Sequence, residues 1–93
     1  MLMRYCEAER VIHQLCGTSF DSHQFILFLI MTNPHLYFNL LERYRYDVAI
    51  TDMQIGLFLE KNKERLRIKK TGTTNSRNIK SGITPCASWE KTN

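Results

Sequence analysis

The residues of this sequence that could act on a partner are mostly basic, and they gather in the last third of the chain. Residues 61–93 hold nine of the 13 lysines and arginines but only two of the nine acidic residues, whereas residues 1–60 have a net negative charge. Such an asymmetry indicates a localised positive field that attracts phosphates or acidic side chains. The candidate nucleic-acid-binding residues are Lys61, Lys63, Arg65, Arg67, Lys69, Lys70, Arg77 and Lys80.

No other residue pattern indicates a catalytic or metal site. Cys6, Cys16 and Cys86 are odd in number and form no C-x-x-C pair, so we interpret them as reduced thiols rather than as a disulfide framework or a zinc ribbon. His13 and Cys16 stand three residues apart, but two ligands without a second pair leave a metal incompletely coordinated. Nucleotide-binding and metalloprotease motifs are absent from the sequence. We therefore expect a protein that is not an enzyme and has no cofactor or metal.

The size and hydropathy of the chain fit one small domain. Its 93 residues are 43% apolar and 24% charged, which is within the range of globular proteins. The longest apolar run, residues 25–31, is far shorter than the roughly 20 residues of a membrane span, and no secretory signal precedes it. We expect a cytoplasmic protein with a single compact domain over residues 1–89 and a frayed end at residues 90–93.

Two helices are expected in the first third of the chain. Apolar side chains recur at helical spacing over residues 3–16, and Gly17 supplies a stop. The next helix contains the run HQFILFLIM, which is apolar on every side after its first turn, and the polar residues at 18–22 include candidate N-caps. Because a helix with one solvent-exposed face would not have this pattern, we expect it to be the central helix of the core.

Two more helices are expected in the middle of the chain. Asn33 and Pro34 mark the start of the third, since proline is tolerated at the first helical position, and its apolar residues recur through about Arg45. The fourth has Thr51 as its expected N-cap, with Asp52 favourably placed at the positive end of the helix dipole.

The fourth helix resembles part of a known DNA-binding unit. Residues 51–59 read TDMQIGLFL, which is similar to the first helix of many bacterial helix-turn-helix units, T-x-x-[EQ]-[IL]-[AG]-x-x-[LI]. In that family the residue matching Gly56 is small because the second helix crosses closely over it. The resemblance implies a recognition helix soon afterwards, although Glu60, Lys61 and Asn62 stand where the family has its turn glycine and a following apolar residue.

Residues 65–69 have three alternative descriptions. Leu66 and Ile68 alternate with basic residues at a period of two, which favours a strand with Arg65, Arg67 and Lys69 on one side. The segment could instead belong to the second helix of a helix-turn-helix unit, or continue the fourth helix.

The strand description predicts a hairpin. Residues 71–75, which include Gly72, would form its turn, and a partner strand would lie within residues 76–89. A hairpin after a helical core resembles the wing of winged-helix domains, which implies that residues at its tip reach phosphates.

These expectations combine into one fold class and two functions. The fold is expected to be mainly α (α+β), with about four helices around a buried central helix, followed by a small C-terminal β-hairpin or wing. The first function is a small non-enzymatic nucleic-acid-binding module for duplex DNA. The alternative is a protein-interaction or adaptor domain that binds an acidic protein or forms a homodimer. The same charges would also be explained by a basic tail that only keeps the chain soluble.

Overall fold

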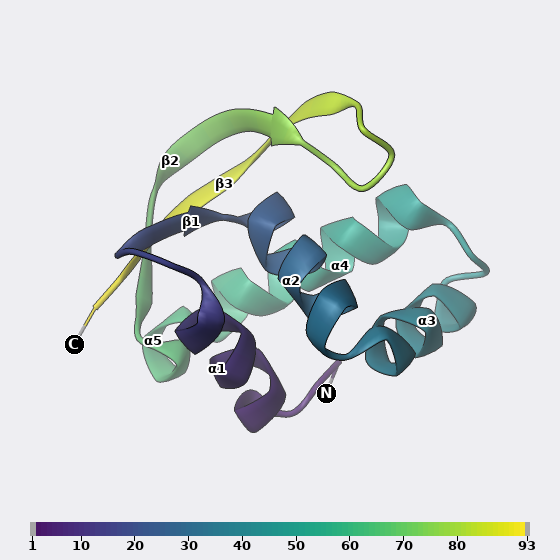
Figure 1. Cartoon of the computed structure of the whole chain (residues 1–93), viewed down its shortest axis with the longest axis horizontal. Helices are drawn as coiled ribbons and strands as arrows, with labels where there is room; N and C mark the ends of the chain where they lie inside the picture. Colours follow the sequence, from purple (N-terminus) through teal and green to yellow (C-terminus); the bar gives the residue numbers. More distant parts are fainter. Residues whose placement is uncertain (1, 93) are drawn as a thin grey trace.

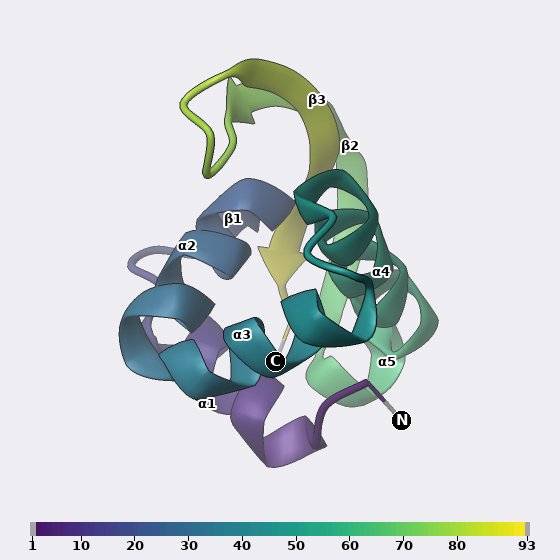
Figure 2. The ribbon, with the colours of Figure 1, turned by 90° about the vertical axis from the view of Figure 1, so that its right-hand side faces the viewer.

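Five helices and three strands make up residues 2–92, which are the residues that the computed structural model of the protein describes (Figure 1). The three strands form one antiparallel sheet in the order β1–β3–β2. The hairpin β2–β3 arches over α2 and α4 (Figures 1 and 2). The elements in chain order are α1 (Tyr5–Gln14), β1 (Ser19–Asp21), α2 (Ser22–Thr32), α3 (Pro34–Arg43), α4 (Val48–Lys61), α5 (Lys63–Leu66), β2 (Ile68–Arg77) and β3 (Ile83–Lys91).

The predicted fold class, a mainly α fold with about four helices around a buried central helix, is wrong. The sheet includes β1, which lies between the first two helices and was not expected at all. Helix α2 is not enclosed by neighbours, since Leu27 is 39% exposed and Met31 is 74% exposed. The uniformly apolar sequence of α2 therefore reflects one face in the core and a second apolar face that remains in solvent. The protein is a small α+β domain.

Strand β3 is the centre of the sheet, and its pairing explains why β1 exists. Phe20 of β1 lies opposite Trp89 of β3, and both side chains are buried. On the other edge, β2 pairs with β3 from Ile68 opposite Lys91 to Arg77 opposite Ile83. A three-residue strand such as β1 is stable only because this long hairpin offers it an edge.

The hairpin is longer than expected, and its turn lies elsewhere. The expectation that residues 71–75 form the turn is wrong, because they lie within β2 and the connecting loop spans residues 78–82. Threonine favours strands, and three of these five residues are threonines. Gly72 has a φ of 153° and lies at a shift of register next to Lys70, so the polar Gly-containing segment produces a bulge rather than a turn.

The end of the chain is paired as far as residue 91, in contrast to the expected fraying from residue 90. Glu90 pairs with Ser19 and Lys69, and the Lys91 amide donates to the Thr18 carbonyl at 2.7 Å. Strand β3 thus extends two residues beyond the predicted domain boundary at residue 89. The expectation for residue 93 lies outside the described residues.

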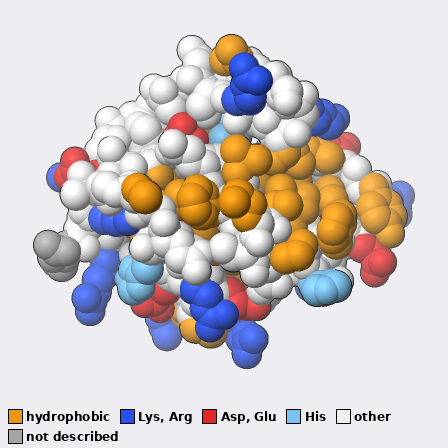
Figure 3. Space-filling view, in the orientation of Figure 1, with side chains coloured by type: hydrophobic (Ala, Val, Ile, Leu, Met, Phe, Trp, Pro, Cys, Tyr) orange, Lys and Arg blue, Asp and Glu red, His pale blue; other side chains and the backbone are white. Residues whose placement is uncertain are grey.

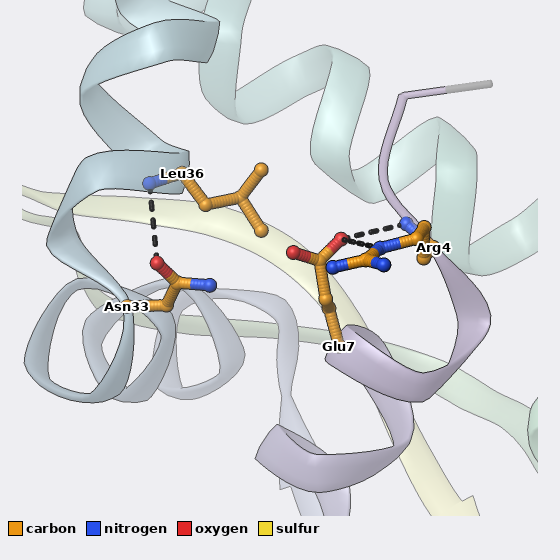
Figure 4. A network of polar contacts seen from close by, with 4 residues as sticks. All are labelled: Arg4, Glu7, Asn33 and Leu36. Carbon is orange, nitrogen blue, oxygen red and sulfur yellow. Dashed lines mark hydrogen bonds and ion pairs between the residues drawn. The ribbon is translucent and has the colours of Figure 1, made fainter.

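Most helix boundaries follow local capping signals. Pro34 is the first residue of α3, as predicted, and the Leu36 amide donates to Asn33 Oδ1 at 3.3 Å (Figure 4). At the start of α1, the Arg4 amide donates to Glu7 Oε1 at 2.8 Å (Figure 4). These side chains satisfy amides that have no partner within the helix.

Helix α4 begins earlier than predicted. Its N-cap is Asp47, whose Oδ1 accepts from the Ile50 amide at 2.9 Å, so the expectation of an N-cap at Thr51 is wrong. Thr51 is fully buried inside the helix and donates its hydroxyl to the Asp47 carbonyl at 2.7 Å. Aspartate and threonine are both common N-cap residues. Thr51 is buried within α4 with its hydroxyl on a backbone carbonyl, so Asp47 is the residue that caps the helix.

The predicted strand over residues 65–69 is also wrong for its first half. Helix α4 is interrupted at Asn62, one further helical turn forms α5, and β2 begins only at Ile68. Between them Arg67 has left-handed backbone angles, φ 57° and ψ 50°, and ends the helix. Leu66, at the end of α5, and Ile68, at the start of β2, are both buried. Their two-residue spacing therefore resembled the alternation of a strand although they belong to different elements.

Candidate functional site

Residues 65–89, from the middle of α5 to near the end of the hairpin, carry positive charge without any acidic residue. Residues 65–89 contain six lysines and arginines and no aspartate or glutamate. They include α5 in part, all of β2, the connecting loop and most of β3. Within residues 65–89 themselves, no acidic side chain offsets the positive charge.

The eight predicted binding residues are spread over five parts of the chain rather than along one strand. Their positions are the end of α4 (Lys61), α5 (Lys63 and Arg65), the following turn (Arg67), β2 (Lys69, Lys70 and Arg77) and the β2–β3 loop (Lys80). The expectation that Arg65, Arg67 and Lys69 share one face of a strand is wrong, because only Lys69 is in a strand.

Two of the eight are paired with acidic side chains. Lys63 Nζ lies 3.0 Å from Glu60 Oε1, and Lys69 Nζ lies 3.3 Å from Glu90 Oε1. All four side chains are at least two-fifths exposed, so each pair contributes little to stability. The pairing nevertheless offsets their charge where a phosphate would approach.

Arg65 contacts an aromatic ring of the helical core. Its guanidinium carbon lies 3.7 Å from the centroid of the Tyr5 ring, and the Tyr5 hydroxyl donates to Asn62 Oδ1 at 2.9 Å. This cation–π contact ties α5 to α1. We therefore assign Arg65 mainly a packing role.

Four of the eight residues remain, three on the hairpin and one at its base. They have exposed side chains and no acidic partner within 4.0 Å among residues 2–92. We call them the hairpin cations: Arg67, Lys70, Arg77 and Lys80. Lys61 is likewise exposed without such a partner, but it lies at the end of α4.

Asn78 holds the hairpin loop in one conformation. Its Oδ1 accepts from the Lys80 amide at 2.9 Å and from the Gly82 amide at 3.1 Å, and its own amide donates to the Gly82 carbonyl at 2.8 Å. Its Nδ2 donates to Thr84 Oγ1 at 3.2 Å. The backbone that carries Lys80 is therefore ordered by side-chain hydrogen bonds rather than by turn sequence alone.

A groove of about 540 Å³ lies between the hairpin and the helices α2 and α4. This volume is within the usual range for small-molecule or peptide-side-chain sites. Its walls combine apolar side chains with ionisable ones. The groove-lining residues that matter below are His23 and Ile26 from α2, Asp52, Met53, Gly56 and Leu57 from α4, Lys70 from β2, Lys80 from the loop, and Cys86 and Trp89 from β3.

Asp52 is the ionisable residue of this groove whose environment is most altered. Burial raises the pKa of its carboxyl, and the Tyr37 hydroxyl, which donates to Asp52 Oδ1 at 2.8 Å, lowers it in part. The charges of His23 and Lys80 act in the same direction as Tyr37. Burial and the Asp52 carboxylate in turn raise the pKa of Tyr37. A carboxyl with a raised pKa at a groove wall is a feature of binding sites as well as of structural pairs.

His23 lies at the bottom of a polar cluster under the hairpin. It is 8% exposed, its Nδ1 lies 2.8 Å from Ser76 Oγ, and its Nε2 lies 3.5 Å from Thr84 Oγ1. Ser76 Oγ lies 3.5 Å from Cys86 Sγ. The cluster joins α2 to both strands of the hairpin.

An apolar face covers the helices next to the groove. Figure 3 shows hydrophobic side chains gathered in a band over α2 and α4, below the hairpin. Large contiguous apolar patches are uncommon on the surface of monomers and often mark interaction sites. We call the following exposed residues of α2, α3 and α4 the apolar face: Leu27, Met31, Phe38, Ile50, Met53 and Leu57.

Sequence reasoning missed the groove, His23 and the role of Asp52. His23 follows a candidate N-cap in an apolar helix, which gave no sign of a partner 53 residues away. Asp52 has a local explanation in the helix dipole, and only the packing of α3 on α4 brings Tyr37 to it. The available signal was weak: His23 is the one ionisable residue of α2, and Asp52 lies among apolar residues in the first half of α4.

Comparisons of the chain with protein-family models, with curated proteins and with solved structures give no significant match. Within residues 2–92, no helix combines the length and the apolar character that crossing a membrane requires.

Proposed function

We propose that this protein is a small nucleic-acid-binding domain that holds the phosphate backbone with its β2–β3 hairpin. The observation that carries the proposal is the acid-free segment, residues 65–89, which forms a hairpin projecting over the helices. Four of its basic residues, the hairpin cations, are exposed and unpaired among residues 2–92. Release of counterions from neutralised phosphates would supply most of the affinity.

The uncharged residues of the hairpin support the same proposal. Thr73, Asn75 and Ser81 are exposed beside the basic side chains, and hydroxyl and amide groups donate hydrogen bonds to phosphate oxygens. A hairpin after the helices is also what the winged-helix resemblance implies, although that expectation was for a smaller one. The two supports are independent, since one concerns side-chain chemistry and the other the order of elements.

The exposed face of α4 limits the proposal to backbone contacts. Ile50, Met53 and Leu57 are exposed there, and these side chains do not make the hydrogen bonds that read base edges. Gly56 does not support a helix crossing either, because a Cβ added to it would have no heavy atom within 4 Å. We therefore propose duplex DNA binding with little dependence on sequence.

The test is a fluorescence-anisotropy titration of a short random-sequence DNA duplex at several salt concentrations. If the four hairpin cations each neutralise about one phosphate, the logarithm of the binding constant should fall with the logarithm of salt concentration with a slope of about −4. A single-stranded oligonucleotide of the same length serves as the comparison. Absence of duplex binding at low ionic strength would contradict the proposal.

The apolar face supports a second candidate function, a protein-interaction domain that forms a homodimer. Six large apolar side chains on α2, α3 and α4 are 39% to 74% exposed, and a second copy would bury the same residues of both chains. Sedimentation equilibrium should then show a dimer that dissociates when Met53 and Leu57 are replaced by glutamate. A monomer at all concentrations would leave an acidic protein as the partner for this candidate.

A further inference from the structure

Three side chains with metal-ligand chemistry converge under the hairpin. They are Asp21 at the end of β1, His23 in the first turn of α2 and Cys86 in β3. One carboxylate oxygen, one imidazole nitrogen and one thiol sulfur lie within 4.8 Å of one another. His23 is buried and the other two residues are partly buried, so the three groups are held together by the packing of the fold rather than lying free on the surface.

We propose that Asp21, His23 and Cys86 bind one divalent transition-metal ion, with Zn²⁺ as the best match. Thiolate, imidazole and carboxylate are the three ligand types that Zn²⁺ takes in proteins. With metal–ligand distances of about 2.0–2.3 Å, ligand atoms in a tetrahedral site are about 3.3–3.8 Å apart. The observed cluster thus needs to contract by roughly an ångström to close around the ion.

The neighbouring polar groups fit such a site. Ser76 Oγ lies 2.8 Å from His23 Nδ1 and 3.5 Å from Cys86 Sγ, so it is already beside two of the three ligands. Either this hydroxyl or a water takes the fourth position of the tetrahedron. Asp21 keeps one oxygen on the Gln24 amide at 2.8 Å as the N-cap of α2, and a carboxylate has a second oxygen for the ion.

Binding converts the Cys86 thiol to a thiolate and releases its proton to the solvent. The ion would tie β3 to α2 and add a second connection to β1, which already pairs with β3. The orientation of the hairpin would then depend on the metal. Since the bound form is folded, the ion also raises the thermal midpoint of unfolding.

The first experiment titrates the whole protein with Co²⁺ and then displaces it with Zn²⁺. A tetrahedral Co²⁺–thiolate site has visible and near-ultraviolet absorption, and we expect one equivalent to bind. His23→Gln and Cys86→Ser should each weaken binding at least about tenfold. His13→Gln and Cys16→Ser are the matched controls, because this exposed histidine–cysteine pair on and next to α1 should leave binding unchanged.

A second measurement covers the case in which a ligand variant does not fold. In Cys6→Ser/Cys16→Ser, Cys86 is the remaining thiol, and Zn²⁺ should slow its reaction with a disulfide reagent at least about tenfold. No Co²⁺ or Zn²⁺ binding by the wild type, no protection of Cys86, or loss of binding in the controls rather than in the cluster variants would each overturn the proposal.

Discussion

The hairpin presents mainly polar and basic groups to the solvent, with Ile83 as an exposed apolar exception, whereas the helices beside it present an apolar face. The hairpin has exposed lysine, arginine, hydroxyl and amide groups, and residues 65–89 contain no acid. The apolar face of α2, α3 and α4 has six exposed large hydrophobic side chains. A net charge of +4 for the whole chain hides this division. The difference is the reason for proposing different partners, a polyanion for the hairpin and an apolar protein surface for the helices.

The two regions are nevertheless one folding unit. Trp89 of β3 is 1% exposed, and its Nε1 donates to Ser22 Oγ of α2 at 3.0 Å. The contact lies at the junction of β1, α2 and the hairpin. If the hairpin were only a solubilising appendage, the largest side chain of the protein would not be buried where it begins.

The largest expected effect comes from breaking this junction. Trp89→Ala should lower the free energy of unfolding by about 3–5 kcal/mol, because it leaves a large cavity and removes the donor to Ser22. Chemical denaturation followed by circular dichroism measures the change. A loss below about 1 kcal/mol would show that the hairpin and the helices are stabilised independently.

Two leucine substitutions on α4 compare the core with the apolar face. Leu59 is fully buried and Leu57 is 54% exposed, so Leu59→Ala should cost about 2–5 kcal/mol and Leu57→Ala less than about 0.5 kcal/mol. Denaturation midpoints at low protein concentration make the comparison. Equal costs would mean that Leu57 is covered in solution and that the apolar face is already occupied.

Asp52, at the wall of the groove, should make the free energy of unfolding depend on pH. Because burial raises the pKa of Asp52 in the folded state, the folded protein holds that proton more tightly than the unfolded chain does. This contribution is complete below the unfolded pKa of about 3.9 and is lost as pH rises through the folded pKa.

Asp52→Asn removes this contribution, so the difference in unfolding free energy between wild type and variant should change over that acidic range. Tyr37→Phe should raise the pKa of Asp52 further and cost about 1 kcal/mol, since it removes a hydrogen bond to the carboxylate. Carboxyl titration by NMR measures the pKa. An Asp52 pKa at or below its ordinary value would contradict the assigned burial.

The smallest expected effect is a gain in stability. Gly56→Ala should stabilise the protein by about 0.5–1 kcal/mol, because Gly56 lies inside α4 and an added Cβ meets no atom within 4 Å. Thermal denaturation measures the gain. A loss of stability would restore the close helix crossing that the helix-turn-helix resemblance implies.

What could be predicted from the sequence is what neighbouring residues determine. The start of α3 at Pro34 and the cap of α2 by a polar residue are encoded within four positions, and both were confirmed. The partner of β1 is nearly 70 residues away in the sequence, so no local pattern predicts a strand at Ser19–Asp21. For the same reason α2 could not be recognised as having an open apolar side.

The predicted strand over residues 65–69 was wrong because of a single residue. The alternation around Leu66 and Ile68 indicated a strand, but the left-handed conformation of Arg67 separates a helical turn from β2. That conformation is uncommon for arginine and has no signal in the sequence.

The measurement that tests the central claim most directly compares two double variants of equal charge. Arg77→Gln/Lys80→Gln removes two hairpin cations, and Arg10→Gln/Arg43→Gln removes two exposed positive charges from α1 and α3. Duplex binding should weaken in the first variant, with the salt slope shallower by about two units, and stay near wild type in the second, while both unfold within about 0.5 kcal/mol of wild type. Equal weakening by both variants would show that only net charge matters and that the hairpin is not a binding surface.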